Sequence, residues 1–234
     1  MKQAELNKLL NSVFRQSAKA HGWESSRGFI YKKSDLLFFS LIIVGQAKQR
    51  RLFYRLGFKL LAFDDLFWKI VSLDENSKQP LGFRAFGAWT ARHTSILEGE
   101  KFTADWETEN IQLAVNEIFA RCEPEAEKVS QSIHGLDDNL RVIEEFHRRL
   151  KDQHPNALSN IWVERLLSSI LKREYDVSEK IIGDRIASHD SGGFQAGSKS
   201  FYELAKEHLR ASHNRTPDNN HGREQGEDHE YSWF

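Results

Sequence analysis

The chain has little cysteine and little proline, and it lacks any long apolar segment. Its one cysteine, Cys122, among 234 residues excludes an intramolecular disulfide bond, which fits a reducing compartment. The longest apolar run, residues 36–44, is far shorter than the ~20 residues that a membrane-spanning helix needs. The first residues, MKQAELNKLLNSVFRQ, have charges throughout and no apolar core of a signal peptide. We therefore expect a cytoplasmic protein with no membrane segment.

The chain also lacks an excess of either positive or negative charge. The formal net charge is -1, so the overall balance does not call for nucleic acid or an acidic membrane surface as partner. Apolar residues make up 39% of the chain and charged residues 29%, which is typical of a globular protein with a polar surface. The 16 phenylalanines and 6 tryptophans indicate an aromatic-rich core or interface.

Strand patterns dominate the first half of the chain. Residues 3–20 have the apolar spacing of a helix, and apolar residues then alternate or run together in short segments. In residues 52–60 every second residue is apolar, which predicts a strand with one wetter face, and a helix follows it at 63–71. The expected strands are 29–33, 36–44, 52–60, 82–90 and a short one at 93–97.

Helical spacing continues from residue 105 onward. We expect Pro124 to interrupt the first helix and a separate helix to follow at 125–133. Ser200 and Glu203 have the spacing of a capping box before a further helical pattern, as do Asp176 and Glu179.

Strands gathered in one half and helices in the other predict an α+β fold. We expect a small, mostly antiparallel sheet with flanking helices, followed by a C-terminal helical region. The corresponding division is a sheet domain at 1–104, a helical region at 105–212 and a tail at 213–234, whose polar composition predicts disorder.

Motifs of catalysis and cofactor binding are also lacking. The sequence contains no phosphate-binding glycine loop, no H-E-x-x-H and no G-x-S-x-G. We therefore expect no cofactor and favour a protein that is not an enzyme. Catalytic groups that meet only in space leave no such motif, so this question stays open.

One alternative is a metal-dependent hydrolase of nucleotides or nucleic acid. Glu144 and His147 are three residues apart on a predicted helix, the spacing of carboxylate-bridged metal sites in helical bundles. The adjacent pair His189 and Asp190 resembles the His-Asp pair of metal-dependent phosphohydrolases of the HD type. These four residues are the candidate metal ligands.

A second alternative is an RNA-binding module. Arg50, Arg51 and Arg55 surround Tyr54, and a sheet face of arginines and aromatics can stack nucleic-acid bases. The same charges also suit the solvent face of an edge strand, where they discourage edge-to-edge pairing. We favour this structural interpretation.

Short motifs that contain aromatic residues follow one another in the first hundred residues. Gly22-Trp23 follows the predicted helix, and GFIYK at 28–32, the apolar segment 38–44 and the segment 53–57 come after it. This order resembles a family of bacterial domains of unknown function, some of which are encoded near polymorphic toxins and are considered immunity proteins. The resemblance implies a protein partner, and it supplies no catalytic residues.

The interpretation that we favour is a non-enzymatic protein-binding module, an immunity or defence-associated protein that occludes a protein partner. Large aromatic side chains commonly anchor such interfaces. The anchor candidates are therefore Trp89, Trp106 and Trp162. The sequence does not indicate an oligomeric state.

Overall fold

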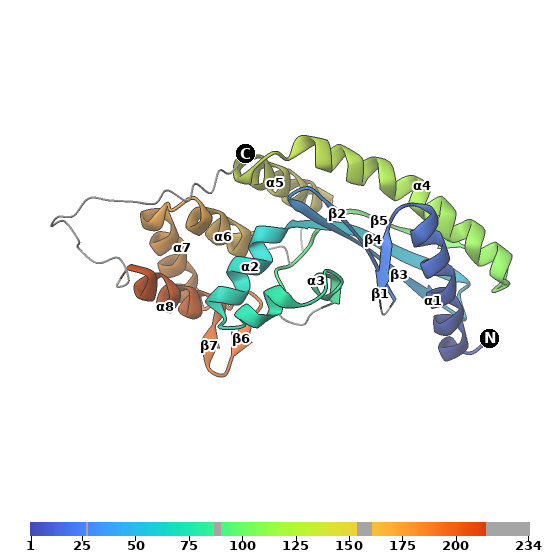
Figure 1. Cartoon of the computed structure of the whole chain (residues 1–234), viewed down its shortest axis with the longest axis horizontal. Helices are drawn as coiled ribbons and strands as arrows, with labels where there is room; N and C mark the ends of the chain where they lie inside the picture. Colours follow the sequence, from blue (N-terminus) through green and yellow to red (C-terminus); the bar gives the residue numbers. More distant parts are fainter. Residues whose placement is uncertain (27, 87–89, 154–160, 214–234) are drawn as a thin grey trace, which may run out of the picture.

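The computed structural model describes residues 1–26, 28–86, 90–153 and 161–213. Its main sheet has five strands in the order β1-β2-β3-β4-β5, each paired antiparallel with the next (Figure 1). The strands are β1 (Glu24–Ser26), β2 (Phe29–Ser34), β3 (Leu37–Gln46), β4 (Arg51–Leu60) and β5 (Thr94–Phe102). A short hairpin, β6 (Gln195–Ala196) with β7 (Lys199–Ser200), lies near the C-terminal helices.

Helices precede, interrupt and follow the sheet. They are α1 (Gln3–Ala20), α2 (Leu61–Ile70), the 3-10 turn η1 (Asp74–Lys78), α3 (Phe83–Phe86), α4 (Thr108–Ser132), α5 (Leu136–Gln153), α6 (Trp162–Leu171), α7 (Tyr175–Ala187) and α8 (Phe201–His213). This arrangement confirms the expected α+β fold. In the described part of the chain, every helix is too short or too polar to cross a membrane.

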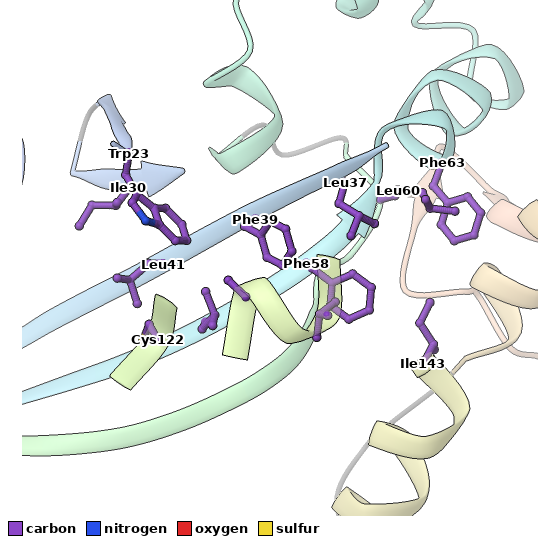
Figure 2. Packing of buried hydrophobic residues seen from close by; sticks show 14 of the residues in the cluster. Trp23, Ile30, Leu37, Phe39, Leu41, Phe58, Leu60, Phe63, Cys122 and Ile143 are labelled. Carbon is purple, nitrogen blue, oxygen red and sulfur yellow. The ribbon is translucent and has the colours of Figure 1, made fainter. Parts of the chain in front are cut away.

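One face of the sheet forms the apolar core. Strands β3 and β4 place Phe39 opposite Phe58 and Leu41 opposite Leu56, and all four side chains are buried. Helices α1 and α4 lie side by side and pack on this face, and Figure 2 shows Cys122 of α4 near Leu41. Burial of this alternating set fixes the strand register, because a slip of one residue would turn it toward solvent.

The sequence prediction of a strand at 82–90 was wrong. Residues Phe83–Phe86 form the short helix α3, whose first turn begins with hydrogen bonds from Phe83 N to Pro80 O and from Arg84 N to Leu81 O. The strand that pairs with β4 is instead β5, which is longer than the segment 93–97 expected from the sequence. Pro80 and the polar contacts of Arg84 with Asp64 and Asp65 favour a turn of helix here.

The expected break at Pro124 was also wrong. Helix α4 is continuous from Thr108 to Ser132 with Pro124 inside it. A proline removes one backbone hydrogen bond in a helix interior. Buried residues on both sides, Cys122 before it and Ala126 and Val129 after it, pack against the sheet and keep the helix in one piece.

Helix α4 completes the core of the sheet, so this layer uses residues beyond position 104. The helices α6, α7 and α8 pack on one another and on α2 at the far end of the sheet (Figure 1). At the start of α8, Ser200 N donates to Glu203 Oε2 at 2.7 Å, and Glu203 N donates to Ser200 Oγ at 3.3 Å, which confirms that capping box. The tail prediction for residues 214–234 lies outside the described residues.

A buried polar network holds the segment before β5 against the second face of the sheet. Lys59 Nζ donates to Asp64 at 2.9 Å, to Arg84 O at 2.9 Å and to Ala91 O at 3.2 Å. The Asp64 carboxylate also accepts from Ala91 N at 2.8 Å. Burial lowers the pKa of Lys59 to about 8 and raises that of Asp64, while their mutual attraction opposes both shifts. This network covers one end of the second face and leaves the other end to solvent.

Candidate functional site

The exposed end of the second sheet face presents aromatic and charged side chains. Strand register places Val44 opposite Phe53, and Arg51 opposite Phe102. Val44 is 54% exposed, Phe53 36% and Phe102 57%, and these values are high for large apolar side chains. We call this surface the open sheet face; its residues are Ile42, Val44, Arg51, Phe53, Arg55, Glu98, Glu100 and Phe102.

Arg51 organises the aromatic side chains of the open sheet face. Its Cζ atom lies 4.7 Å from the centre of the Phe102 ring and 5.5 Å from that of Phe53. Its Nη1 atom lies 2.8 Å from Glu100 Oε2. The guanidinium therefore links two exposed rings from different strands into one preformed surface.

The charges on the open sheet face are paired across strands. Arg51 pairs with Glu100, and Arg55 Nε lies 2.9 Å from Glu98 Oε1. Each arginine is thus balanced by a glutamate on β5. A surface of this kind lacks the excess positive charge that binding to a phosphate backbone requires.

The residues proposed for nucleic-acid binding do not form one surface. Tyr54 is 4% exposed and lies on the core face, where its hydroxyl fits against Gly99. Arg50 sits in the turn before β4 with φ 50, and its Nη1 atom donates to Ala104 O at 2.5 Å. Arg51 and Arg55 alone lie on the open sheet face.

Two of the three tryptophans proposed as anchors lie in the described part of the chain. Trp106 is half-buried, and its Nε1 atom donates to Ala47 O at 2.8 Å. Trp162 is half-buried between two guanidinium groups, 4.7 Å from Arg165 and 4.4 Å from Arg185. Trp89 lies outside the described residues. In the described part of the chain, Phe102 is the most exposed aromatic side chain, and Tyr175 and Phe53 follow at 37% and 36%.

The candidate metal ligands lie in two separate pairs, Glu144 and His147 on α5, and His189 and Asp190 after α7. Glu144 on α5 accepts two hydrogen bonds from Arg165, at 2.8 and 3.1 Å. His189 is exposed just after α7, and Asp190 accepts from Gly192 N at 2.8 Å. His147 faces a cavity between α5 and β5. Within the described ranges, no three His, Cys, Asp or Glu side chains gather as a metal site would require.

That cavity contains a residue that the sequence analysis did not select. Glu164 on α6 is buried, and burial raises its pKa from the ordinary 4.5 to about 7. The sequence contains a weak indication that this residue is buried. An acidic residue lies on the apolar stripe of a helix, three residues after Ile161 and three before Leu167.

Comparisons with protein-family models, with curated proteins and with solved structures find no match to this chain.

Proposed function

We propose that this protein is a non-enzymatic binding module that occludes a protein partner with the open sheet face. The observation that carries the proposal is the preformed cluster of Phe53, Phe102 and Arg51, in which two exposed rings flank one guanidinium. Aromatic residues and arginine are enriched at the centres of protein interfaces. Because each ring already lies against the guanidinium, little side-chain freedom is lost when a partner binds.

The charge pattern favours a protein over a nucleic acid as the partner. The two arginine–glutamate pairs leave the open sheet face close to neutral. An apolar centre that is surrounded by both positively and negatively charged side chains suits a protein partner with an apolar centre and a polar rim. The partner that we propose therefore presents apolar side chains to Phe53 and Phe102, surrounded by polar groups.

The immunity role is the specific form of this function that we propose. It is supported by the motif order in residues 1–100, which resembles bacterial domains encoded near polymorphic toxins. An immunity protein acts by stoichiometric occlusion, so it needs a rigid surface rather than catalytic groups. The sheet provides such a surface, because β3, β4 and β5 are hydrogen-bonded along the length of the open sheet face.

Capture of the partner tests this proposal. The tagged chain is incubated with extract of its native cells, with and without nuclease, beside the double variant Phe53→Ser, Phe102→Ser. Leu113→Ser is the control, because Leu113 on α4 is a comparably exposed apolar residue at 61%. We expect a stoichiometric protein that survives nuclease, binds the wild type and the control, and is lost with the double variant. The captured protein should have an activity that this chain suppresses.

Two results would contradict the proposal. One is a partner that binds the double variant as well as it binds the wild type. The other is recovery that depends on intact nucleic acid, which would support the RNA-binding alternative.

A further inference from the structure

A second candidate site is a cavity of about 310 Å³ between strand β5 and helices α5 and α6. Its size is at the lower end of the range for small-molecule sites. Polar and apolar groups share its walls: Arg92, His147, Glu164, Ile143, Phe146 and Ile161. We call it the Glu164 cavity and define it by these six residues.

Glu164 places a buried carboxyl group in the wall of this cavity. The residue is 7% exposed, and its Oε2 atom is buried without a hydrogen-bond partner in the described part of the chain. A buried polar atom without a partner is costly, and native structures contain few of them. The wall of the cavity thus holds an acceptor whose hydrogen-bonding capacity the described residues do not fill.

Arg92 supplies a positive charge at the same cavity. The residue is exposed, and its charge acts on Glu164, lowering the carboxyl pKa against the larger effect of burial. Its guanidinium lies against Gly193, which has φ +70, and a Cβ atom at that glycine would collide with it. The glycine thus leaves room for the arginine beside the cavity.

The remaining titratable groups of the cavity contribute little net charge. Arg55 and Glu98 form an ion pair at the rim, with 2.9 Å between Nε and Oε1. Burial lowers the pKa of His93 to about 3, and it also lowers the pKa of His147, so both imidazoles are neutral at pH 7. One carboxyl group and one guanidinium therefore set the electrostatics of the site.

We propose that the Glu164 cavity binds a small zwitterion, an α-amino acid with an apolar side chain. The ligand ammonium donates to Glu164, the ligand carboxylate pairs with Arg92, and the ligand side chain packs against Ile143, Phe146 and Ile161. Arginine suits the carboxylate because its planar fork can donate two parallel hydrogen bonds. This inference does not depend on the proposed protein-binding function.

Binding of this kind should depend on pH. Glu164 must be ionised to pair with an ammonium group, and its carboxyl loses its proton only near pH 7. The imidazole of His93 stays neutral across this range, because burial lowers its pKa to about 3. Affinity should therefore decrease by about tenfold for each pH unit below 7.

Titration calorimetry with the full chain at pH 8 tests the proposal. The probe is L-leucine, compared with L-leucinamide, which lacks the carboxylate, and with 4-methylpentanoate, which lacks the ammonium. We expect L-leucine to bind and each analogue to bind about tenfold more weakly or worse. Glu164→Gln and Arg92→Gln should weaken the binding of L-leucine to a similar degree. The exposed control Glu127→Gln should leave this affinity unchanged.

Thermal unfolding of each variant accompanies the titrations and shows that the near-isosteric Glu164→Gln protein is folded. Failure of L-leucine to bind the wild-type chain would overturn the assignment. Equal binding by wild type and Glu164→Gln would overturn it as well. Guanosine monophosphate is tested as a nucleotide probe. If it binds, if Glu164→Gln abolishes this binding, and if L-leucine does not bind, the proposed ligand class is wrong.

Discussion

Lys59 Nζ lies 2.8 Å from Asp64 Oδ2, and the two side chains are 1% and 0% exposed. They join the end of β4 to the start of α2, and through Arg84 and Ala91 they fix the chain that leads into β5. The position of β5 on the sheet, and with it the open sheet face, thus depends on this buried charge pair. The apolar alternation of β4 alone does not predict the pair.

Removing one partner of this pair should be strongly destabilising. Among the described residues, Lys59→Met leaves the buried Asp64 carboxylate with Arg84 as its nearby cation, at 3.3 Å between Nη1 and Oδ2. We expect a loss of about 3 kcal/mol in the free energy of unfolding, measured with urea. The double variant Lys59→Met, Asp64→Leu should cost less than the sum of the two single changes, because no charge is then left uncompensated.

Lys78→Met is the control for that experiment. Lys78 pairs with Glu75 at the same distance of 2.8 Å, but the two side chains are 72% and 82% exposed. It should change the stability by less than about 0.5 kcal/mol. Equal effects of Lys59→Met and Lys78→Met would show that the buried network contributes nothing beyond a surface pair.

Glu164 should make the wild-type protein less stable as the pH rises. Its pKa increases from 4.5 in the unfolded chain to about 7 in the folded chain, because burial disfavours the charged form. Between these values the folded state holds more protons, so its stability is greatest below pH 4.5 and decreases up to pH 7. The change amounts to about 3 kcal/mol.

Urea unfolding of the wild type and of Glu164→Gln at pH 5 and pH 8 measures this contribution. The glutamine variant has no group to titrate at this position, so it should gain about 2.5 kcal/mol relative to the wild type between the two pH values. Parallel pH profiles for the two proteins would show that Glu164 is not the buried carboxyl described above.

Pro124→Ala should stabilise the protein. Pro124 lies inside the continuous helix α4 and is exposed, so alanine restores a backbone donor without disturbing the core. Proline costs about 3 kcal/mol relative to alanine in a helix interior, and its restriction of the unfolded chain returns up to about 1 kcal/mol. We expect a net gain of about 2 kcal/mol in urea unfolding. A loss of stability would indicate that α4 is shaped around the proline.

Cys122 should be unreactive in the folded protein. It is fully buried on α4, and burial raises the pKa of its thiol to about 12. Because only the thiolate reacts, alkylation by iodoacetamide at pH 8 should be at least ~10³-fold slower than that of glutathione in the same tube. Mass spectrometry should show full modification only after unfolding in urea. Rapid labelling of the native protein would contradict the packing of α4 on the sheet.

Much of the sheet could be predicted from the sequence, because each strand carries its own apolar pattern. The alternation in 52–60 identified both faces of β4 and placed Phe53 and Arg55 on the wetter one. It could not indicate that Phe53 and Phe102 both lie against Arg51, since this arrangement depends on the pairing of β4 with β5, which is far along the chain. The tryptophans were selected by residue type alone, and the partners of Trp106 and Trp162, Ala47 and Arg185, are distant in the sequence.

The segments that were predicted wrongly are those where tertiary contacts override a local signal. The proline in α4 is tolerated because the residues around it are buried, which no local rule detects. Lys59 has the pattern of a solvent-facing residue, yet Asp64, Arg84 and Ala91 enclose it. Glu164 resembles a surface charge in the sequence, and only the packing of α5, α6 and β5 shows that it faces a cavity.

Hydroxyl-radical footprinting of the captured complex tests the central claim most directly. Oxidation of Phe53 and Phe102 is compared between the free chain and the partner-bound chain, with Tyr175, an aromatic residue 37% exposed on α7, as the internal reference. If the open sheet face is the interface, both phenylalanines become protected and Tyr175 does not change. Unchanged oxidation of Phe53 and Phe102 in a stoichiometric complex would place the interface elsewhere and contradict the proposed function.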